Sequence, residues 1–141
     1  MNQTAKGLFD VQLGPEALSA VAQDTGLGRL SLDKTYHGDL SATGRGEMLA
    51  FRSGTPGSAG YVAMETVRGA LHGRNGTFVL QHSSTMTRGV PTQSITVVPD
   101  SGTDALTGLT GSLVIEITDG KHAYDFRYAL PDEPSCAGEQ A

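Results

Sequence analysis

Two titratable side chains, Glu65 and His82, lie in a stretch that otherwise has the pattern of two oily strands, METVRGALHGRNGTFVLQHSSTM. A carboxyl group among apolar side chains has a raised pKa and acts as a general acid or base. An imidazole in the same setting accepts or donates a proton near neutral pH. Each group also has a structural interpretation. In that interpretation, the carboxylate is either hydrogen-bonded within the core or solvated at the rim of the fold. The histidine is a core residue whose ring nitrogens are hydrogen-bonded.

A second set of polar groups, His122, Tyr124 and Tyr128, alternates with outward residues near the C-terminus. A tyrosine hydroxyl in an apolar lining needs a partner, and a ligand carbonyl is one candidate. The alternative is packing, with the hydroxyl at the rim. Lys34 falls in phase with two apolar strand positions, where a desolvated lysine would be a nucleophile. We favour a bulge that turns it outward.

The sequence contains no motif typical of a metal site or of a phosphate-binding loop. Of the four histidines, His37 and His72 fall on outward phases, and the chain has no H-x-H pair, no HExxH motif and no cysteine cluster. The glycine runs lack the GK[ST] ending of a phosphate loop. Ser84 shares the face of His82 without a nucleophile-elbow context. We therefore expect no metal and no cofactor.

Composition limits the partners. The chain has 141 residues, which suits one domain, with 38% hydrophobic and 18% charged residues. The net charge is -5 and no basic run exists, so nucleic acid and an anionic membrane surface are not expected as partners. No apolar segment approaches the roughly 20 residues of a membrane span. The N-terminus lacks a signal core, and the single Cys136 suits a reducing cytoplasm.

The elements that must position these side chains are strands, because apolar residues recur with a period of two. Only residues 15–25 have a helical pattern, and they are too few to cover a sheet. Eight strands without covering helices pack sheet on sheet or close into a barrel, and a barrel of about eight strands leaves room for one small ligand. The eight stretches are residues 5–13, 29–40, 46–52, 61–71, 77–86, 93–99, 112–118 and 122–130.

We therefore predict an all-β fold, a single closed antiparallel barrel of lipocalin-like size. The barrel domain is expected over residues 1–130, with a flexible tail over 131–141. A homo-oligomer is left open.

Turn chemistry sets the register of two hairpins. Asn75-Gly76 predicts a type I′ turn, which pairs Glu65 with Met86 and Gly69 with His82. Glu65 and His82 are then four residues apart along the strand, about 13 Å, so any cooperation between them needs a ligand in between. Asp119-Gly120 forms the second turn. The aromatic and methionine side chains expected to line a ligand site on these inward faces are Tyr61, Phe78, Met86, Phe126 and Tyr128.

Residues 28–130 resemble a bacterial family known only as a domain of unknown function, number three-two-two-four. The resemblance lies in LDKTYHGDLSATGRGEMLAF, ETVRGALHGRNGTFVLQH, VVPDSGTDALTGLTG and HAYDFRYAL. It implies a small β-barrel like that of allene oxide cyclase and the dirigent proteins, and no established activity. Segment 14–27 departs from the family pattern, and the chain has no tryptophan. The matching polar residues are Glu65, Arg68, Gln81, His82, His122 and Tyr124.

These observations lead to one functional hypothesis and two alternatives. The hypothesis is a cofactor-free isomerase or cyclase that binds a small apolar molecule, with proton transfer by Glu65 or His82 and orientation by Tyr124 and His122. One alternative is a carrier barrel that binds without chemistry. The other is a structural or oligomerisation module filled by its own side chains. A cavity of about 300 Å³ or more favours a ligand.

Overall fold

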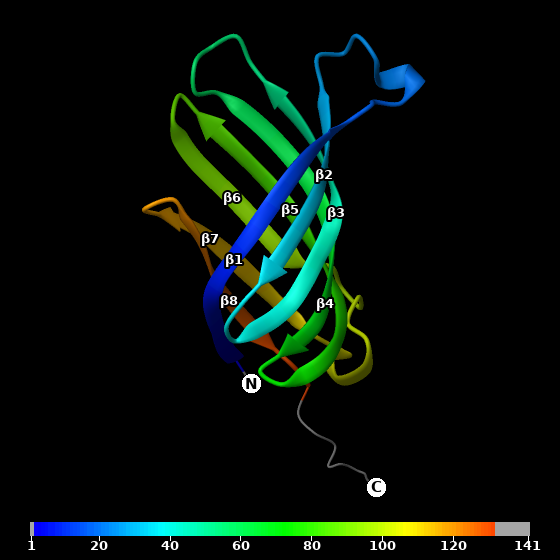
Figure 1. Cartoon of the computed structure of the whole chain (residues 1–141), viewed down its shortest axis with the longest axis vertical. Helices are drawn as coiled ribbons and strands as arrows, with labels where there is room; N and C mark the ends of the chain where they lie inside the picture. The colour runs from blue at the N-terminus through cyan, green and yellow to red at the C-terminus, as the bar shows by residue number, and fades with distance from the viewer. Residues whose placement is uncertain (1, 132–141) are drawn as a thin grey trace, which may run out of the picture.

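The computed structural model describes residues 2–131, and the predicted tail with Cys136 lies outside the described residues apart from residue 131. Eight antiparallel strands follow one another around a closed barrel, which confirms the predicted fold (Figure 1). The strands are β1 (Asn2–Glu16), β2 (Gly28–Tyr36), β3 (Leu40–Arg52), β4 (Ala59–Leu71), β5 (Arg74–Thr87), β6 (Val90–Val97), β7 (Thr110–Thr118) and β8 (Lys121–Ala129). Within the described residues, no helix is long and apolar enough to cross a membrane.

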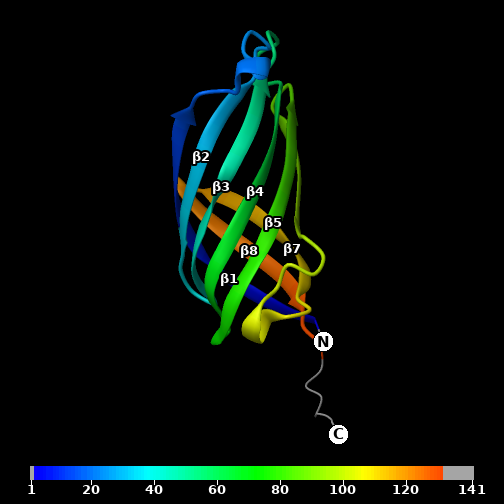
Figure 2. The same ribbon diagram turned by 90° about the vertical axis from the view of Figure 1, so that its right-hand side faces the viewer.

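The barrel closes where β1 meets β8. Their register runs from Asn2 opposite Ala129 to Phe9 opposite His122. The last residues of β1 therefore pair with β2 alone. The β7–β8 hairpin has nine residues in each strand, whereas β4 has 13 and β5 has 14. Figures 1 and 2 both show this hairpin ending at mid-height, while the β3–β4 and β5–β6 tips rise above it.

The end of the barrel opposite those tips is packed solid. The rings of Phe78 and Phe126 stack with centroids 5.7 Å apart, and Phe126 stacks on Tyr128 at 5.4 Å. The glycine-rich segment after β6 folds across this end, and its Leu106 and Leu109 are each only 1% exposed. Aromatic and leucine side chains thus fill the lower half of the barrel, as expected for a small closed barrel.

The turn between β4 and β5 falls at His72-Gly73, so the predicted turn at Asn75-Gly76 was wrong. His72 and Gly73 carry the positive φ angles of a type I′ turn, 47° and 80°. Asn75 instead lies in β5, opposite Ala70. Gly76 is needed for close packing, because a Cβ there would lie 2.3 Å from the Thr103 carbonyl oxygen. The shift in register is even, so the predicted inward faces survive.

The helix expected over residues 15–25 is also absent. β1 continues to Glu16, and a single 3₁₀ turn covers Ala20–Ala22, with no side-chain hydrogen bond at its N-cap. None of the three residues in this turn is buried. A helix here has no apolar surface to pack against, and short helices are marginal without tertiary packing. The Asp119-Gly120 hairpin was predicted correctly, with Ile115 opposite Tyr124 and Ile117 opposite His122.

Candidate functional site

A cluster of charged side chains lies inside the barrel, beneath its open half. Among the described residues, the buried charged or strongly polar side chains are Lys34 at 4% exposure, Glu65 at 0% and His82 at 3%. They come from β2, β4 and β5. Charged side chains are almost never fully buried unless they are paired, so this cluster needs a specific arrangement.

Glu65 is the centre of that arrangement. Its Oε1 accepts hydrogen bonds from Lys34 Nζ at 3.1 Å and from His82 Nε2 at 2.9 Å. Its Oε2 accepts a hydrogen bond from the Tyr36 hydroxyl at 2.5 Å. An ionised carboxylate can only accept, so His82 carries a proton on Nε2. In the neutral imidazole, Nδ1 is then the free acceptor.

The strand register and Gly44 make room for the cluster. Ala63 is opposite His82, and Glu65 is opposite Gly46 on β3, with Gly44 the next inward position. A Cβ on Gly44 would lie 1.9 Å from Glu65 Oε2. Any larger residue at Gly44 would therefore displace the carboxylate from its partners.

The electrostatics favour an ionised Glu65. Burial raises its pKa, but the His82 hydrogen bond, the Lys34 charge and the Tyr36 hydrogen bond outweigh burial and leave the pKa below its ordinary value. Burial and the neighbouring Glu65 charge raise the pKa of Tyr36 well above its ordinary value, so its hydroxyl stays a donor. The predicted raised pKa for Glu65 is thus wrong, because the sequence did not show its three donors.

Two further predictions are corrected here. Glu65 and His82 touch directly at 2.9 Å, whereas the predicted register separated them along the strand. With the turn at His72-Gly73, His82 moves opposite Ala63, two residues from Glu65. Lys34 faces inward rather than outward. No bulge interrupts β2, where Lys34 pairs regularly with Val11 and Gly44.

Aromatic rings surround the cluster on the β1 and β8 side. The Lys34 ammonium lies 5.0 Å from the Phe9 ring centroid, within cation–π range. His122 is half-buried, and its ring centroid lies 5.3 Å from that of Phe9. Tyr124 packs edge-on against Tyr36, and its hydroxyl bonds the main chain, donating to the His37 carbonyl oxygen at 2.7 Å and accepting from Leu40 N–H at 2.9 Å. His122 and Tyr124 thus support the cluster without contacting Glu65.

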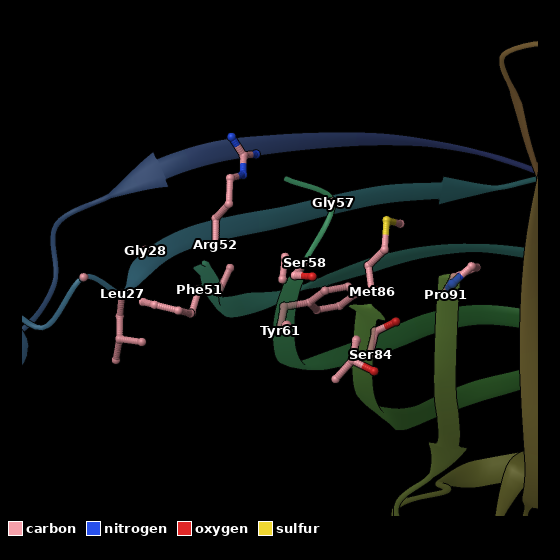
Figure 3. A pocket seen from close by; sticks show the side chains of 15 residues that line it. Leu27, Gly28, Phe51, Arg52, Gly57, Ser58, Tyr61, Ser84, Met86 and Pro91 are labelled. Atoms are coloured by element: carbon pink, nitrogen blue, oxygen red, sulfur yellow. The ribbon is translucent and has the colours of Figure 1, made fainter. Parts of the chain in front are cut away.

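A cavity of about 590 Å³ occupies the open end of the barrel. Its walls come from the β3–β4 and β5–β6 tips and the start of β2, and Figure 3 shows Leu27, Phe51, Tyr61 and Met86 among the side chains around it. Tyr61 and Met86, predicted to contact a ligand, line this cavity. The other predicted ligand contacts, Phe78, Phe126 and Tyr128, lie in the packed core at the opposite end.

Measured along the strand from a residue that lines the cavity, His82 is closer to the cavity than Glu65 is. Ser84 lines the cavity, and His82 is the next inward position of β5, about 7 Å along the strand. Glu65 is four residues beyond Tyr61, about 13 Å. The small Ala63 faces His82 at this level. His82 itself is not part of the cavity wall.

The sequence reasoning missed the roles of Tyr36 and Lys34 as partners of Glu65. Two features of the sequence could have indicated these roles. Lys34 is in phase with buried positions, and Gly44 and Gly46 lie two residues apart on β3, which pairs with both β2 and β4. Glycines in a strand often mark a close approach by another group. In residues 2–131 no three His, Cys, Asp or Glu side chains gather closely enough to hold a metal ion.

These features define a class: a closed eight-stranded barrel with one packed end, one hollow end and a buried charged cluster between them. Residues 5–128 match the family described as protein of unknown function DUF3224, and the chain belongs to this family. A similar crystal structure is a DUF3224 protein of unknown function from Shewanella oneidensis MR-1. It is 45% identical with a TM-score of 0.88, covering 94% of this chain and 100% of that one. No curated protein matches the chain.

Proposed function

We propose that this barrel binds a small apolar molecule at its open end and that His82 exchanges a proton with it. The observation that carries the proposal is the cavity of about 590 Å³ together with a buried, oriented imidazole, His82, which is the next inward position on β5 after the wall residue Ser84. The volume falls within the range of small-molecule sites, and the walls combine apolar groups with a few polar ones such as Ser58 and Ser84.

In this proposal, His82 is the proton acceptor and Glu65 is its positioning residue. Glu65 accepts from Nε2 of His82, so the opposite nitrogen, Nδ1, is left to take a proton from a ligand. The carboxylate also stabilises the imidazolium that forms, as in catalytic triads. Glu65 has a lowered pKa and three donors, which makes it a poor acid or base itself. The Tyr124 hydroxyl bonds main-chain groups, so the proposal gives it no ligand contact.

A carrier without chemistry is the second candidate. The observation in its favour is that His82 is only 3% exposed and does not line the cavity. A ligand resting at the mouth would then never touch the cluster, which would serve only to fix the strands. The likeness to allene oxide cyclase that the sequence suggests stays a prediction in either case.

Ligand binding is tested with N-phenylnaphthylamine, a neutral apolar dye that fluoresces in apolar sites. Ser84 is half-buried and lines the cavity, whereas its neighbour Ser83 is exposed on the outer face. We expect Ser84→Phe to weaken dye binding by about tenfold or more, because the ring projects from the wall and takes up part of the cavity, and Ser83→Phe to leave it within about twofold. Equal effects of the two variants, or no binding by the wild type, would refute the cavity as a ligand site.

Proton transfer is tested with nitrobenzisoxazole, a small apolar compound whose ring opens when a base removes one proton. His82→Gln keeps an N–H donor for Glu65 but removes the base, and His37→Gln is the control because His37 is exposed and paired with Asp10. We expect His82→Gln to slow ring opening by about tenfold or more and His37→Gln to leave it unchanged. Equal rates, with dye binding intact, would leave the carrier as the function.

A further inference from the structure

Charge is divided unevenly along this chain. Between Glu47 and Asp100 the sequence holds four arginines, and Glu65 is its sole acidic residue. That stretch therefore carries a formal charge of +3, from four positive and one negative group, in a chain whose total is -5. The one carboxylate is buried and already paired with Lys34. The wall from the end of β3 to β6 is thus cationic while the rest of the molecule is acidic.

Two of these arginines lie at the mouth of the cavity. Among the described residues that line the cavity, Arg52 alone carries a charge. Arg88 sits on the neighbouring tip, where its N–H donates to Ser58 Oγ at 2.9 Å, and the Gly89 N–H donates to the Gly57 carbonyl at 3.0 Å. Ser58 and Gly57 both line the cavity, so the two tips form one continuous rim.

Arg52 has no carboxylate partner within residues 2–131. Other arginines of the barrel do: Arg29 donates from Nε to Glu47 Oε1 at 3.0 Å, and Arg45 lies 3.7 Å from Asp33. A guanidinium beside an apolar cavity whose lining residues include no Asp or Glu is suited to receive an anionic group of a ligand. Arg52 is also solvent-exposed, so an incoming anion reaches it without rearrangement of the barrel.

We propose that the ligand is an amphipathic anion, with an apolar body in the cavity and one carboxylate-like or sulfonate-like head held at the rim by Arg52. This inference rests on the proposed function and adds the chemical class of the ligand. Arg52 is opposite Ala59, and Ala63, opposite His82, lies four residues further along β4. A ligand that spans both points therefore has an apolar body about 13 Å long.

A matched pair of dyes tests the head group. Anilinonaphthalene sulfonate has the same aromatic body as N-phenylnaphthylamine plus one sulfonate. We expect the wild-type protein to bind the sulfonate dye more tightly, and Arg52→Gln to weaken that binding by about fivefold, as for an exposed charge pair. The neutral dye is expected to bind Arg52→Gln and wild type equally. Added salt should weaken binding of the sulfonate dye and leave binding of the neutral dye unchanged.

Arg68→Gln is the control, because Arg68 is exposed on the outside of β4 and the substitution removes the same charge from the same wall. It is expected to leave both dyes unaffected. If Arg68→Gln weakens the sulfonate dye as much as Arg52→Gln, or if neither does, the rim site is refuted while binding of the neutral dye still upholds the cavity. If neither dye binds the wild type, the inference and the proposed function fall together.

Discussion

At the scale of single residues, the buried cluster is a neutral unit built around one anion. Glu65 supplies the negative charge, Lys34 the positive charge, and Tyr36 and His82 add two further donors. Both carboxylate oxygens are occupied, so the desolvation of Glu65 is compensated on each side. The same contacts that stabilise the ion pair also fix the tautomer of His82, which joins a stability role to the proposed chemical one.

Glu65→Gln is expected to be strongly destabilising, because it leaves the Lys34 ammonium buried without a countercharge. The expected loss is about 3–5 kcal/mol of unfolding free energy, measured by urea denaturation. Lys34→Met should be destabilising for the converse reason. The double variant should lose clearly less than the sum of the two, since neither charge is then left alone. Strict additivity would show that the two side chains do not act as a pair.

The pH dependence of stability follows from the same carboxylate. The folded-state pKa of Glu65 lies below its ordinary 4.5, so the ionised form favours the fold. This contribution is fully present above pH 4.5 and is lost as the pH falls through the lower folded-state pKa. We expect the unfolding free energy of the wild type to fall more steeply in acid than that of Glu65→Gln. Parallel curves for the two proteins would contradict the lowered pKa.

At the scale of elements, strand phase was predicted correctly in both hairpins, whereas strand register was predicted correctly for β7–β8 and wrongly for β4–β5. The alternation of apolar and polar residues placed Glu65 and His82 on inward faces, because side chains alternate strictly along a strand. The segment LHGRNG offers two turn sequences three residues apart, and local chemistry favours Asn-Gly. The packing of residues 98–109 over Gly76 favours the turn at His72-Gly73. A local sequence pattern does not contain that long-range contact.

Two substitutions test this register directly. Asn75 is an exposed strand residue opposite Ala70, so Asn75→Thr should leave the unfolding free energy within about 0.5 kcal/mol. Gly73 has a φ of 80°, so Gly73→Ala should cost about 1 kcal/mol or more. Thermal and urea unfolding of the two variants give both values. The reverse order would place the turn at Asn75-Gly76 after all.

At the scale of the whole molecule, the two halves of the barrel differ in how their interior is filled. The lower half is filled by aromatic and leucine side chains, and the upper half is hollow because the β7–β8 hairpin stops short. Composition and periodicity predicted a closed barrel of eight strands, since no helix was available to cover a sheet. They did not predict which half was hollow. Tyr61 and Phe78 have the same inward phase and differ only in their position along the barrel axis, which the alternation pattern does not give.

The seam between β6 and β7 is the thinnest part of the closed wall. Its backbone register has a single pair, Thr96 opposite Ser112. Above it the Gln93 side chain takes the place of a paired strand: its Oε1 accepts from Ile115 N–H at 2.9 Å and its Nε2 donates to the Ile115 carbonyl at 3.2 Å. One side-chain amide therefore closes the barrel beside the hollow half.

Gln93→Ala is expected to open this seam locally without unfolding the barrel. The Ile115 amide loses its acceptor, and a hydrogen bond worth about 1 kcal/mol corresponds to roughly a fivefold to tenfold faster hydrogen exchange at that amide. Native-state exchange followed by NMR measures this amide by amide. The Tyr124 and Phe126 amides of β8, which Gln93 does not contact, serve as internal controls. An unchanged rate at Ile115 would mean that the seam is held by other contacts, and uniform acceleration at all three amides would mean that Gln93 supports the whole barrel.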